Sequence, residues 1–476
     1  MTQQVALPLW LVVALAAFAL IGIADRVFAP SVRWFFRRRL NVAIDELNQR
    51  LDLRIRPFKL TRRQTLVDQL MYDPRVVEAI EAEASERGEP RAVIAARAER
   101  YAREIVPAFS ATAYFGFGTR AARWLSEFVY RVRLGYSDDA ALAGIDPEAT
   151  VVFVMNHRSN MDYVLVTYMA STRASLSYAV GEWARVFLLQ GLIRSMGAYF
   201  IRRRSNDPLY RRVLARYVHM ATEQGVTQAV FPEGGLSRDG RLAEPRLGLL
   251  GYMTGEFDPG RSRDIVFVPV GLNYDRVIED RVLTAASERQ VTGRDFRVRS
   301  GTVARFFFNL ARLRLQRRLY RYGYACVSFG RPLSFRQWQE RHAPDYAAMD
   351  REARFAVISR LGRDLMAEIG RIVPALPVAL AATVFLSSGE AWLSQAELKS
   401  RVAGLIAELE RGGAHVHIPR ADRDYAVEAG LRMLTLRHLV ETNDSGGLRA
   451  NPAERVLLEY YANSIGHLLA NVQDSR

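Results

Sequence analysis

Between about residue 150 and residue 330, short apolar runs alternate with helical patterns, and this alternation constrains the fold more than any other feature. The runs are rich in β-branched and aromatic residues, and each passes into polar or glycine-rich sequence: TVVFVMNH, GAYFIRRR, TQAVFPEGG, DIVFVPVGLNY and YACVSFGRPL. The segment LYRRVLARYVHMATEQG, between two of them, has helical apolar spacing. Alternating strands and helices predict an α/β fold with a mainly parallel sheet flanked by helices. In such sheets, functional groups collect at the carboxyl ends of the strands.

The regions on both sides of this α/β segment are predicted to be helical. Residues 41–135 contain patterns such as PRVVEAIEAEASERG, which begins at a proline and ends at a glycine. From about residue 374, helical patterns return, and Ser394 with Glu397 predicts a capping box at a helix start. The apolar run VPALPVALAATVFL is short and broken by proline, so we interpret it as a core segment.

The N-terminus predicts a membrane anchor. Residues 5–24 carry no charge, and twenty apolar residues suffice to cross the hydrocarbon layer as a helix. The arginines and aromatic residues of VRWFFRRRL follow, which places the remaining chain on the cytoplasmic side of the inner membrane. The alternative is a cleaved signal peptide, but the leading MTQQ has no basic side chain. We predict four parts: an anchor with its basic segment (1–40), a helical domain (41–135), an α/β catalytic domain (136–373) and a small, mostly helical C-terminal domain (374–476).

Composition narrows the classes of partner. The single cysteine, Cys326, excludes a disulfide framework and a cysteine-based zinc site. The net charge of +15 favours anionic partners such as anionic lipid or an acidic carrier. Neither zinc-finger spacing nor an aromatic-glycine RNA-binding signature is present in the sequence, which disfavours nucleic acid.

His157 and Asp162 form the candidate catalytic pair. His157 follows the strand pattern VVFVM, and Asp162 comes five residues later, where the next helix is expected to begin. An aspartate bonded to one imidazole nitrogen fixes the tautomer and leaves the other nitrogen to accept a proton. The alternative is a helix-capping aspartate beside a structural histidine.

Two further strand ends carry candidate anion-binding residues. GAYFIRRR ends in Arg202, Arg203 and a third arginine, and the alternative there is a solvated charge run. The turn FPEGGLSRDG offers a carboxylate, two glycines whose backbone can approach a ligand, a hydroxyl and a guanidinium: Glu233, Gly234, Gly235, Ser237 and Arg238. The alternative there is a capped turn without a ligand.

Together with FVPVGLNYD, these segments resemble the four sequence blocks of the glycerolipid acyltransferase superfamily, in the same order. The motifs HRSNMDY, IRRR and EGGLSRDGRL are most similar to those of the membrane-bound bacterial glycerol-3-phosphate acyltransferases, and the likeness extends from about residue 65 to 470. Two positions depart from the pattern. Leu236 stands where the close family usually carries arginine, and position 273 is asparagine.

The resemblance implies transfer of a fatty acyl group from a thioester to the sn-1 hydroxyl of glycerol 3-phosphate, the first step of phospholipid synthesis. His157 would act as the base and Asp162 would orient it. The phosphate contacts would be Arg202, Arg203 and Arg238, and the glycerol end would be shaped by Glu233, Gly234, Gly235 and Ser237. The resemblance implies no metal and no redox cofactor, with acyl-CoA or acyl carrier protein as the co-substrate.

Two alternatives stay open at this point. One is acylation of lysophosphatidate or dihydroxyacetone phosphate instead. The other is a catalytically inactive, membrane-anchored protein that binds lipid or a carrier, which the intact His157 and Asp162 pair disfavours. The donor, the acyl chain length, the oligomeric state and the role of the C-terminal domain are open as well.

Overall fold

The structure is a computed structural model that describes residues 55–171, 175–180, 194–202, 205–292 and 322–474 of the 476-residue chain. The predicted anchor at residues 1–40 lies outside these ranges. Within them, no helix combines the length and the apolar character needed to cross a bilayer. Residues 55–476 group into one compact unit.

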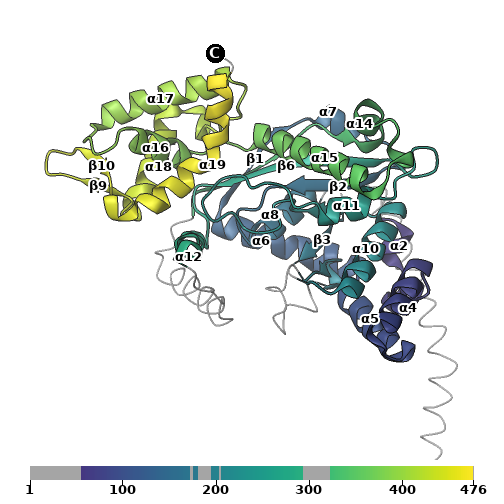
Figure 1. Ribbon diagram of the computed structural model, residues 1–476. Helices are drawn as coiled ribbons and strands as arrows, with labels where there is room; N and C mark the ends of the chain where they lie inside the picture. The colour runs from purple at the N-terminus through teal and green to yellow at the C-terminus, as the bar shows by residue number, and fades with distance from the viewer. Residues whose placement is uncertain (1–54, 172–174, 181–193, 203–204, 293–321, 475–476) are drawn as a thin grey trace, which may run out of the picture. The chain divides into compact units, whose positions relative to one another are not determined.

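An eight-stranded sheet forms the centre of this unit (Figure 1). Its strand order is β1-β7-β6-β2-β5-β3-β4, and β8 pairs with β6 beside this path. Within the described part of this sheet, five strand pairs are parallel, and only β6–β7 and β6–β8 are antiparallel. The predicted mainly parallel α/β fold is therefore confirmed. The strands are β1 (Arg131–Ser137), β2 (Thr150–Met155), β3 (Ser177–Val180), β4 (Tyr199–Phe200), β5 (Gln228–Val230), β6 (Ile265–Tyr274), β7 (Tyr324–Phe329) and β8 (Leu333–Ser334).

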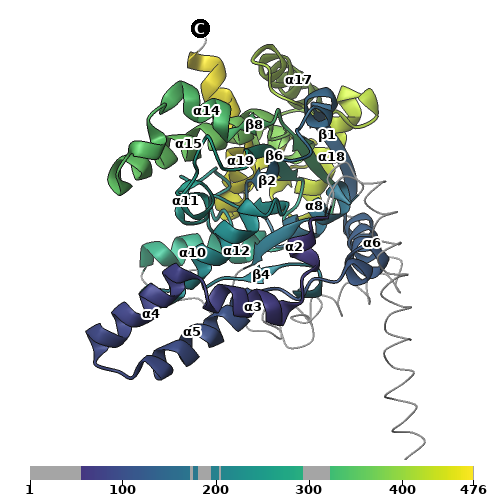
Figure 2. The same ribbon diagram turned by 90° about the vertical axis from the view of Figure 1, so that its right-hand side faces the viewer.

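Helices cover both faces of the sheet. From one face, Val152 and Val154 of β2 pack into a core with α10, α11 and α15, because alternate residues of a strand point to the same side. Figure 1 shows α6 and α8 on the side of the sheet away from α15, and Figure 2 shows α3, α4 and α5 beside α10. The helices of this region are α2 (Pro57–Leu60), α3 (Arg63–Met71), α4 (Pro74–Arg87), α5 (Arg91–Ile105), the π-helix η1 (Thr112–Gly118), α6 (Thr119–Val129), α7 (Asp139–Ala143), α8 (Asp162–Ala170), α10 (Pro208–Glu223), α11 (Gly248–Thr254), α12 (Asp280–Thr292), α14 (Phe335–His342), the 3-10 turn η3 (Tyr346–Ala348) and α15 (Arg351–Ile372).

The parallel strands place the predicted motifs at one edge of the sheet. Strand β2 lies between β5 and β6 and is parallel to both, and all six of its residues are buried. The continuous apolar run of β2 follows from cover on both faces. The carboxyl ends of β2, β5 and β6 lead directly into the segments that begin at Asn156, Phe231 and Asp275. These three segments are therefore neighbours at one edge of the sheet.

Strand β1 corrects one part of the sequence interpretation. Residues 41–135 are predicted to be helical, and this range includes most of RAARWLSEFVYRVRLG. In the structure, α6 ends at Val129, and Arg131–Ser137 form a strand that pairs in parallel with β7. The partner of Arg131 is Tyr324, far along the chain, so local periodicity carries no signal of this pairing. The strand also crosses the predicted boundary at residue 135.

The C-terminal region is mostly helical, as predicted. Ser394 and Glu397 form the predicted capping box, with both reciprocal hydrogen bonds present. The run VPALPVALAATVFL supplies α16, which is buried and contacts the three other long helices of this region. The elements are α16 (Pro377–Ser387), α17 (Gln395–Arg411), the 3-10 turn η4 (Pro419–Ala421), α18 (Arg423–Leu436), the hairpin β9 (Val440–Thr442) and β10 (Leu448–Ala450), the 3-10 turn η5 (Pro452–Glu454) and α19 (Arg455–Asp474).

Candidate active site

The predicted catalytic pair forms a hydrogen bond at the carboxyl end of β2. His157 lies in the loop after the strand, and Asp162 is the first residue of α8, as the spacing predicted. His157 Nδ1 lies 2.9 Å from Asp162 Oδ2, and both side chains are fully buried. A carboxylate is an acceptor, so it fixes the tautomer with the proton on Nδ1. The Nε2 atom is then the ring nitrogen that can take a proton from a hydroxyl.

Asp162 is held by three further donors. The backbone N–H groups of Arg158 and Ser159 donate to Oδ2 at 2.7 and 3.0 Å. The hydroxyl of Tyr274, the last residue of β6, donates to Oδ1 at 2.6 Å. Because every bond uses the carboxylate as an acceptor, the side chain is fixed in position and in its hydrogen-bonding role. This geometry suits the orienting partner of a general base.

Glu233 supports the catalytic loop from β5. Its Oε1 accepts the backbone N–H of His157 at 2.8 Å, and its Oε2 accepts that of Ala243 at 3.2 Å. The residue is 4% exposed. Both oxygens thus accept a hydrogen bond from the backbone, and the contact of Glu233 with glycerol hydroxyls stays a prediction. Its role here is to hold the His157 backbone.

Burial gives Glu233 an unusual titration. It raises the pKa of Glu233 from 4.5 to about 7, against smaller lowering effects from its two backbone hydrogen bonds and from Arg158. The folded protein therefore binds this proton more tightly than the unfolded chain does. The resulting stabilisation is complete below the ordinary pKa of 4.5 and is lost as the pH rises through about 7.

We expect the Glu233→Gln substitution to remove this pH dependence. The wild-type melting temperature should fall more between about pH 5 and about pH 8 than that of the variant. Only the wild type has a carboxyl group at position 233 that loses a proton in this range. Thermal unfolding at both pH values measures the difference. Equal falls in the two proteins would mean that Glu233 is ionised throughout this range.

The turn FPEGGLSRDG, residues 231–240, is called the glycine-rich turn below, and its own side chains hold it. Ser237 donates its hydroxyl to the carbonyl oxygen of Arg241 at 2.8 Å and accepts the N–H of Gly240 at 3.1 Å. The N–H of Ser237 donates to the carbonyl oxygen of His157 at 2.9 Å. Ser237 is buried and its hydroxyl shapes the turn, and its role at the glycerol end stays a prediction.

Gly234 adopts a left-handed backbone and leaves room for an arginine. Its φ is +68°, and an added Cβ would lie 2.5 Å from Cδ of Arg246. Around Gly235, by contrast, an added Cβ would meet no atom within 4 Å. The turn therefore presents its backbone openly at Gly235 and beneath an arginine side chain at Gly234.

The predicted phosphate contacts have different outcomes. Arg202 donates to both carboxylate oxygens of Glu104, at 2.9 and 2.7 Å, and its guanidinium lies over the ring of Tyr101. Arg202 is thus paired within the protein, and its contact with phosphate stays a prediction. Arg238 lies exposed on the turn, and Arg203 lies outside the described residues.

A cavity of about 200 Å³ lies beside the catalytic pair. Its wall includes Phe231 and Tyr163, the two rings that contact the imidazole of His157. Phe231 is stacked on the imidazole, with centroids 4.0 Å apart. Arg246 and Gly234 line the same cavity. The cavity thus joins the glycine-rich turn, an arginine and the rings that flank the candidate base.

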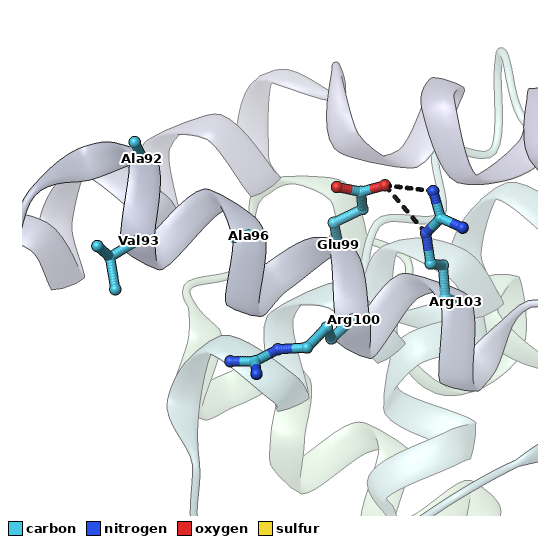
Figure 3. Close-up of a pocket in the computed structure, with 6 residues that line it drawn as sticks. All are labelled: Ala92, Val93, Ala96, Glu99, Arg100 and Arg103. Atoms are coloured by element: carbon cyan, nitrogen blue, oxygen red, sulfur yellow. Dashed lines mark hydrogen bonds and ion pairs between the residues drawn. The ribbon is translucent and has the colours of Figure 1, made fainter.

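A second hollow, on the surface of α5, lacks these features (Figure 3). All of its lining residues belong to α5, and the charge of Arg103 is met by Glu99 at 2.6 Å. Its lining includes neither the rings that contact His157 nor any residue of the glycine-rich turn. We therefore place the candidate active site at the cavity beside His157.

Sequence reasoning missed several parts of the site. Tyr274 lies in the segment FVPVGLNYD, but nothing in the sequence indicates that its hydroxyl reaches Asp162. Half-buried Glu279 accepts the Ser159 hydroxyl at 2.8 Å and the Asn160 side-chain amide at 3.0 Å, and so braces the same loop. Burial raises the pKa of Glu279. These partners come from distant segments, so only the fold brings them together.

That the reaction needs no metal stays a prediction, because it concerns the chemistry of the acyl transfer. Among the described residues, no group of three or more histidine, cysteine, aspartate or glutamate side chains is arranged to hold a metal ion. The single cysteine is buried in β7, and burial raises the pKa of its thiol to about 12. Cys326 is therefore a core residue.

Comparison with known proteins gives two family matches along this chain. Residues 140–273 match the acyltransferase family, and residues 307–472 match the glycerol-3-phosphate acyltransferase C-terminal region. The first match contains the catalytic pair and the glycine-rich turn. The second contains β7, α15 and the whole C-terminal helical region.

Curated relatives carry one common name. The glycerol-3-phosphate acyltransferase of Pseudomonas putida KT2440 is 28% identical over 431 residues, which cover 86% of this chain and 49% of the relative. Those of Pseudomonas entomophila and Actinobacillus succinogenes are 29% and 27% identical, with 49% and 50% of their lengths covered. The chain therefore spans about half the length of these relatives. The crystal structure of the 1-acyl-sn-glycerophosphate (LPA) acyltransferase PlsC from Thermotoga maritima has 18% identity and a TM-score of 0.29 over 53% of this chain and 78% of its own, and this likeness carries no weight here.

The parallel sheet, the His-x4-Asp pair at the end of β2 and the acyltransferase match define the class: residues 140–273 are an acyltransferase domain. The C-terminal match and the relatives then narrow it. The chain is similar to the glycerol-3-phosphate acyltransferases, the family that the motifs indicate.

Proposed function

We propose that the protein is a glycerol-3-phosphate 1-O-acyltransferase. The observation that carries this proposal is the buried His157–Asp162 hydrogen bond of 2.9 Å beside a cavity that contains the glycine-rich turn. The names of the relatives support the choice of acceptor. The donor is an acyl thioester of coenzyme A or of acyl carrier protein, and the net charge of +15 suits both.

In the proposed reaction, Nε2 of His157 takes the proton of the sn-1 hydroxyl as its oxygen attacks the thioester carbonyl. Asp162 stabilises the imidazolium that forms. The C–S bond then breaks, the imidazolium returns the proton to the leaving thiolate, and the products are 1-acylglycerol 3-phosphate and a free thiol. This sequence of steps needs a base and an acceptor hydroxyl, and no redox change occurs.

Arg246 is our candidate for the acceptor's phosphate. It lies across Gly234 at the cavity wall, and its backbone N–H donates to the carbonyl oxygen of Pro232 at 2.8 Å. Within the described ranges, no carboxylate forms an ion pair with its guanidinium, whereas Arg202 at the same cavity is paired with Glu104. An exposed arginine at the rim of a cavity can meet a phosphate in two-point geometry.

We expect Arg246→Ala to raise the KM for glycerol 3-phosphate by roughly 10- to 150-fold, because a lost charge-assisted hydrogen bond costs about 1.5–3 kcal/mol. The KM for the acyl donor should change little. Arg212, an exposed arginine of α10 that does not line the cavity, provides the charge-matched control as Arg212→Ala. Equal effects of the two substitutions on the KM for glycerol 3-phosphate would reduce the role of Arg246 to general surface charge.

An acceptor panel tests the proposed function directly. The purified full chain is given a long-chain acyl-CoA, or the matching acyl carrier protein, with glycerol 3-phosphate, dihydroxyacetone phosphate or lysophosphatidate in turn. Thiol release that depends on glycerol 3-phosphate supports the proposal. Release with lysophosphatidate alone would identify a different acyltransferase, and no release with any acceptor would favour the inactive binding protein.

We also propose that the protein acts at the inner membrane, anchored by residues 5–24 with the catalytic unit in the cytoplasm. The uncharged run and the basic-aromatic segment after it support this proposal. A membrane location suits the substrates and products, because the donor's acyl chain and the product are lipid-like.

The anchor predicts how the protein fractionates. The full chain should stay in the membrane pellet after a wash at high salt, whereas a variant without residues 1–30 should be released by the same wash. Residual binding of that variant to anionic vesicles should weaken as salt rises, because ionic contacts are screened. A truncated chain that resists high salt as firmly as the full chain would contradict the anchor.

A further inference from the structure

Helix α19 of the C-terminal region contacts several segments that build the catalytic site. Its residues from Tyr460 to Ser464 meet the loop after β2, the glycine-rich turn and the end of β6. From its sequence, this region is predicted only to form a helical domain. The contacts therefore call for an explanation in terms of the site.

The first contact involves Arg158, the residue that follows His157. Arg158 is 2% exposed, and its guanidinium carbon lies 5.0 Å from the centre of the Tyr460 ring. Its Nη1 donates to the carbonyl oxygen of Gly240 in the glycine-rich turn. Among the described residues, its Nε and Nη2 atoms have no hydrogen-bond partner, and no carboxylate forms an ion pair with it. The aromatic ring and one carbonyl oxygen therefore hold this buried cation.

The second contact joins α19 to the turn itself. Gly240 has a φ of +88°, and a Cβ at this position would overlap the carbonyl oxygen of Tyr460. Asn463 donates its side-chain amide to the carbonyl oxygen of Asp239 at 2.9 Å. The backbones of the helix and of the turn thus approach each other as closely as glycine allows.

The third contact joins α19 to the end of β6. Asn273 donates its side-chain amide to the Ser464 hydroxyl at 3.2 Å, and Tyr461 accepts the N–H of Val277 at 3.2 Å. Between these positions lies Tyr274, whose hydroxyl fixes Asp162. The departure at position 273 therefore has a structural use, because an asparagine amide can bridge the strand to the helix.

We infer that α19 is a positioning element of the active site, which holds the His157 loop through the contact between Tyr460 and Arg158. Tyr460 touches neither His157 nor the cavity, so it acts through Arg158 and is a positioning residue. The catalytic part of this inference rests on the proposed acyltransferase function. The part that concerns loop order does not.

The closing experiment compares three substitutions in α19 of the full chain. Tyr460→Leu removes the ring, and Tyr460→Phe keeps it. The hydroxyl is dispensable because it has no hydrogen-bond partner in the part of the chain that the structure describes. Leu458→Ala is the control, since Leu458 is fully buried in the same helix and its truncation loosens the C-terminal core. Acyl transfer to glycerol 3-phosphate from a long-chain acyl-CoA and amide hydrogen exchange are both measured on folded protein.

We expect Tyr460→Leu to lower kcat by about 10- to 100-fold with little change in KM, because a small misplacement of a catalytic group is costly. Tyr460→Phe should restore kcat. In a double-mutant cycle, adding Arg158→Gln to Tyr460→Leu should cost little more than either substitution alone. Amide exchange should rise at residues 157–159 and 237–240 in Tyr460→Leu and not in Leu458→Ala.

Other outcomes would overturn the inference. A kcat in Tyr460→Leu no lower than in Leu458→Ala would show that general stability explains the effect. A rise in KM for glycerol 3-phosphate at constant kcat in Arg158→Gln would make Arg158 a substrate contact instead. A wild-type protein without acyl transfer would defeat the proposed function, and the exchange measurement would still decide whether α19 orders the loop.

Discussion

Substitution of His157 by alanine should lower kcat by roughly 10²- to 10⁴-fold, the usual cost of losing a general base. The imidazole is fully buried and lies 2.9 Å from Asp162. Alanine leaves no group at this position that can accept a proton. Its backbone N–H and carbonyl oxygen bond to Glu233 and Ser237 and remain in the variant. The fold around the loop should therefore persist.

The measurement is kcat with glycerol 3-phosphate and a long-chain acyl-CoA, on protein whose melting temperature is recorded in parallel. Asp162→Asn provides the partner variant, because an amide can no longer accept all four hydrogen bonds. Asp162→Asn should lower kcat less than His157→Ala does, and it should lower the melting temperature more. If His157→Ala keeps more than about a tenth of the wild-type kcat, another group is the base.

The catalytic pair was predictable because its signal is local. A strand pattern, a histidine and an aspartate five residues later lie within one short segment, and the parallel sheet then brings that segment beside the glycine-rich turn. The four sequence blocks, in their order, indicate the family. The order of the strands, with β2 between β5 and β6, follows from no local pattern.

The roles of individual polar residues were harder to predict, because a sequence shows which groups exist but not which partner each one finds. Glu233 was expected to meet a substrate hydroxyl, yet two backbone N–H groups occupy its oxygens. Arg202 was expected to meet phosphate, yet Glu104, from α5, pairs with it. In both cases a partner from another segment claims the charged group, and burial makes such internal pairing favourable.

Arg246 illustrates the converse case. It lies outside the four blocks, and no motif singled it out. Its importance follows from three features of the structure, namely its place at the cavity, its position across Gly234 and the lack of an acidic partner within the described ranges. We therefore add Arg246 to the candidate phosphate contacts.

Gly240→Ala should destabilise the protein more than any other single substitution at the glycine-rich turn. The backbone of Gly240 has a φ of +88°, where side chains are strained, and the new Cβ would overlap the carbonyl oxygen of Tyr460. Because the obstacle is backbone in a buried part of α19, it has no rotamer to adopt. Strain and overlap together should cost about 3 kcal/mol or more.

Gly446→Ala separates the two causes. Gly446 has a φ of +80° in the hairpin between β9 and β10, and an added Cβ there meets no atom within 4 Å. It should therefore show the backbone strain alone, about 1–3 kcal/mol. Urea unfolding of both variants and the wild type measures the difference. If Gly240→Ala costs no more than Gly446→Ala, α19 yields easily at Tyr460, and the close packing of the helix on the turn cannot be what holds the turn in place.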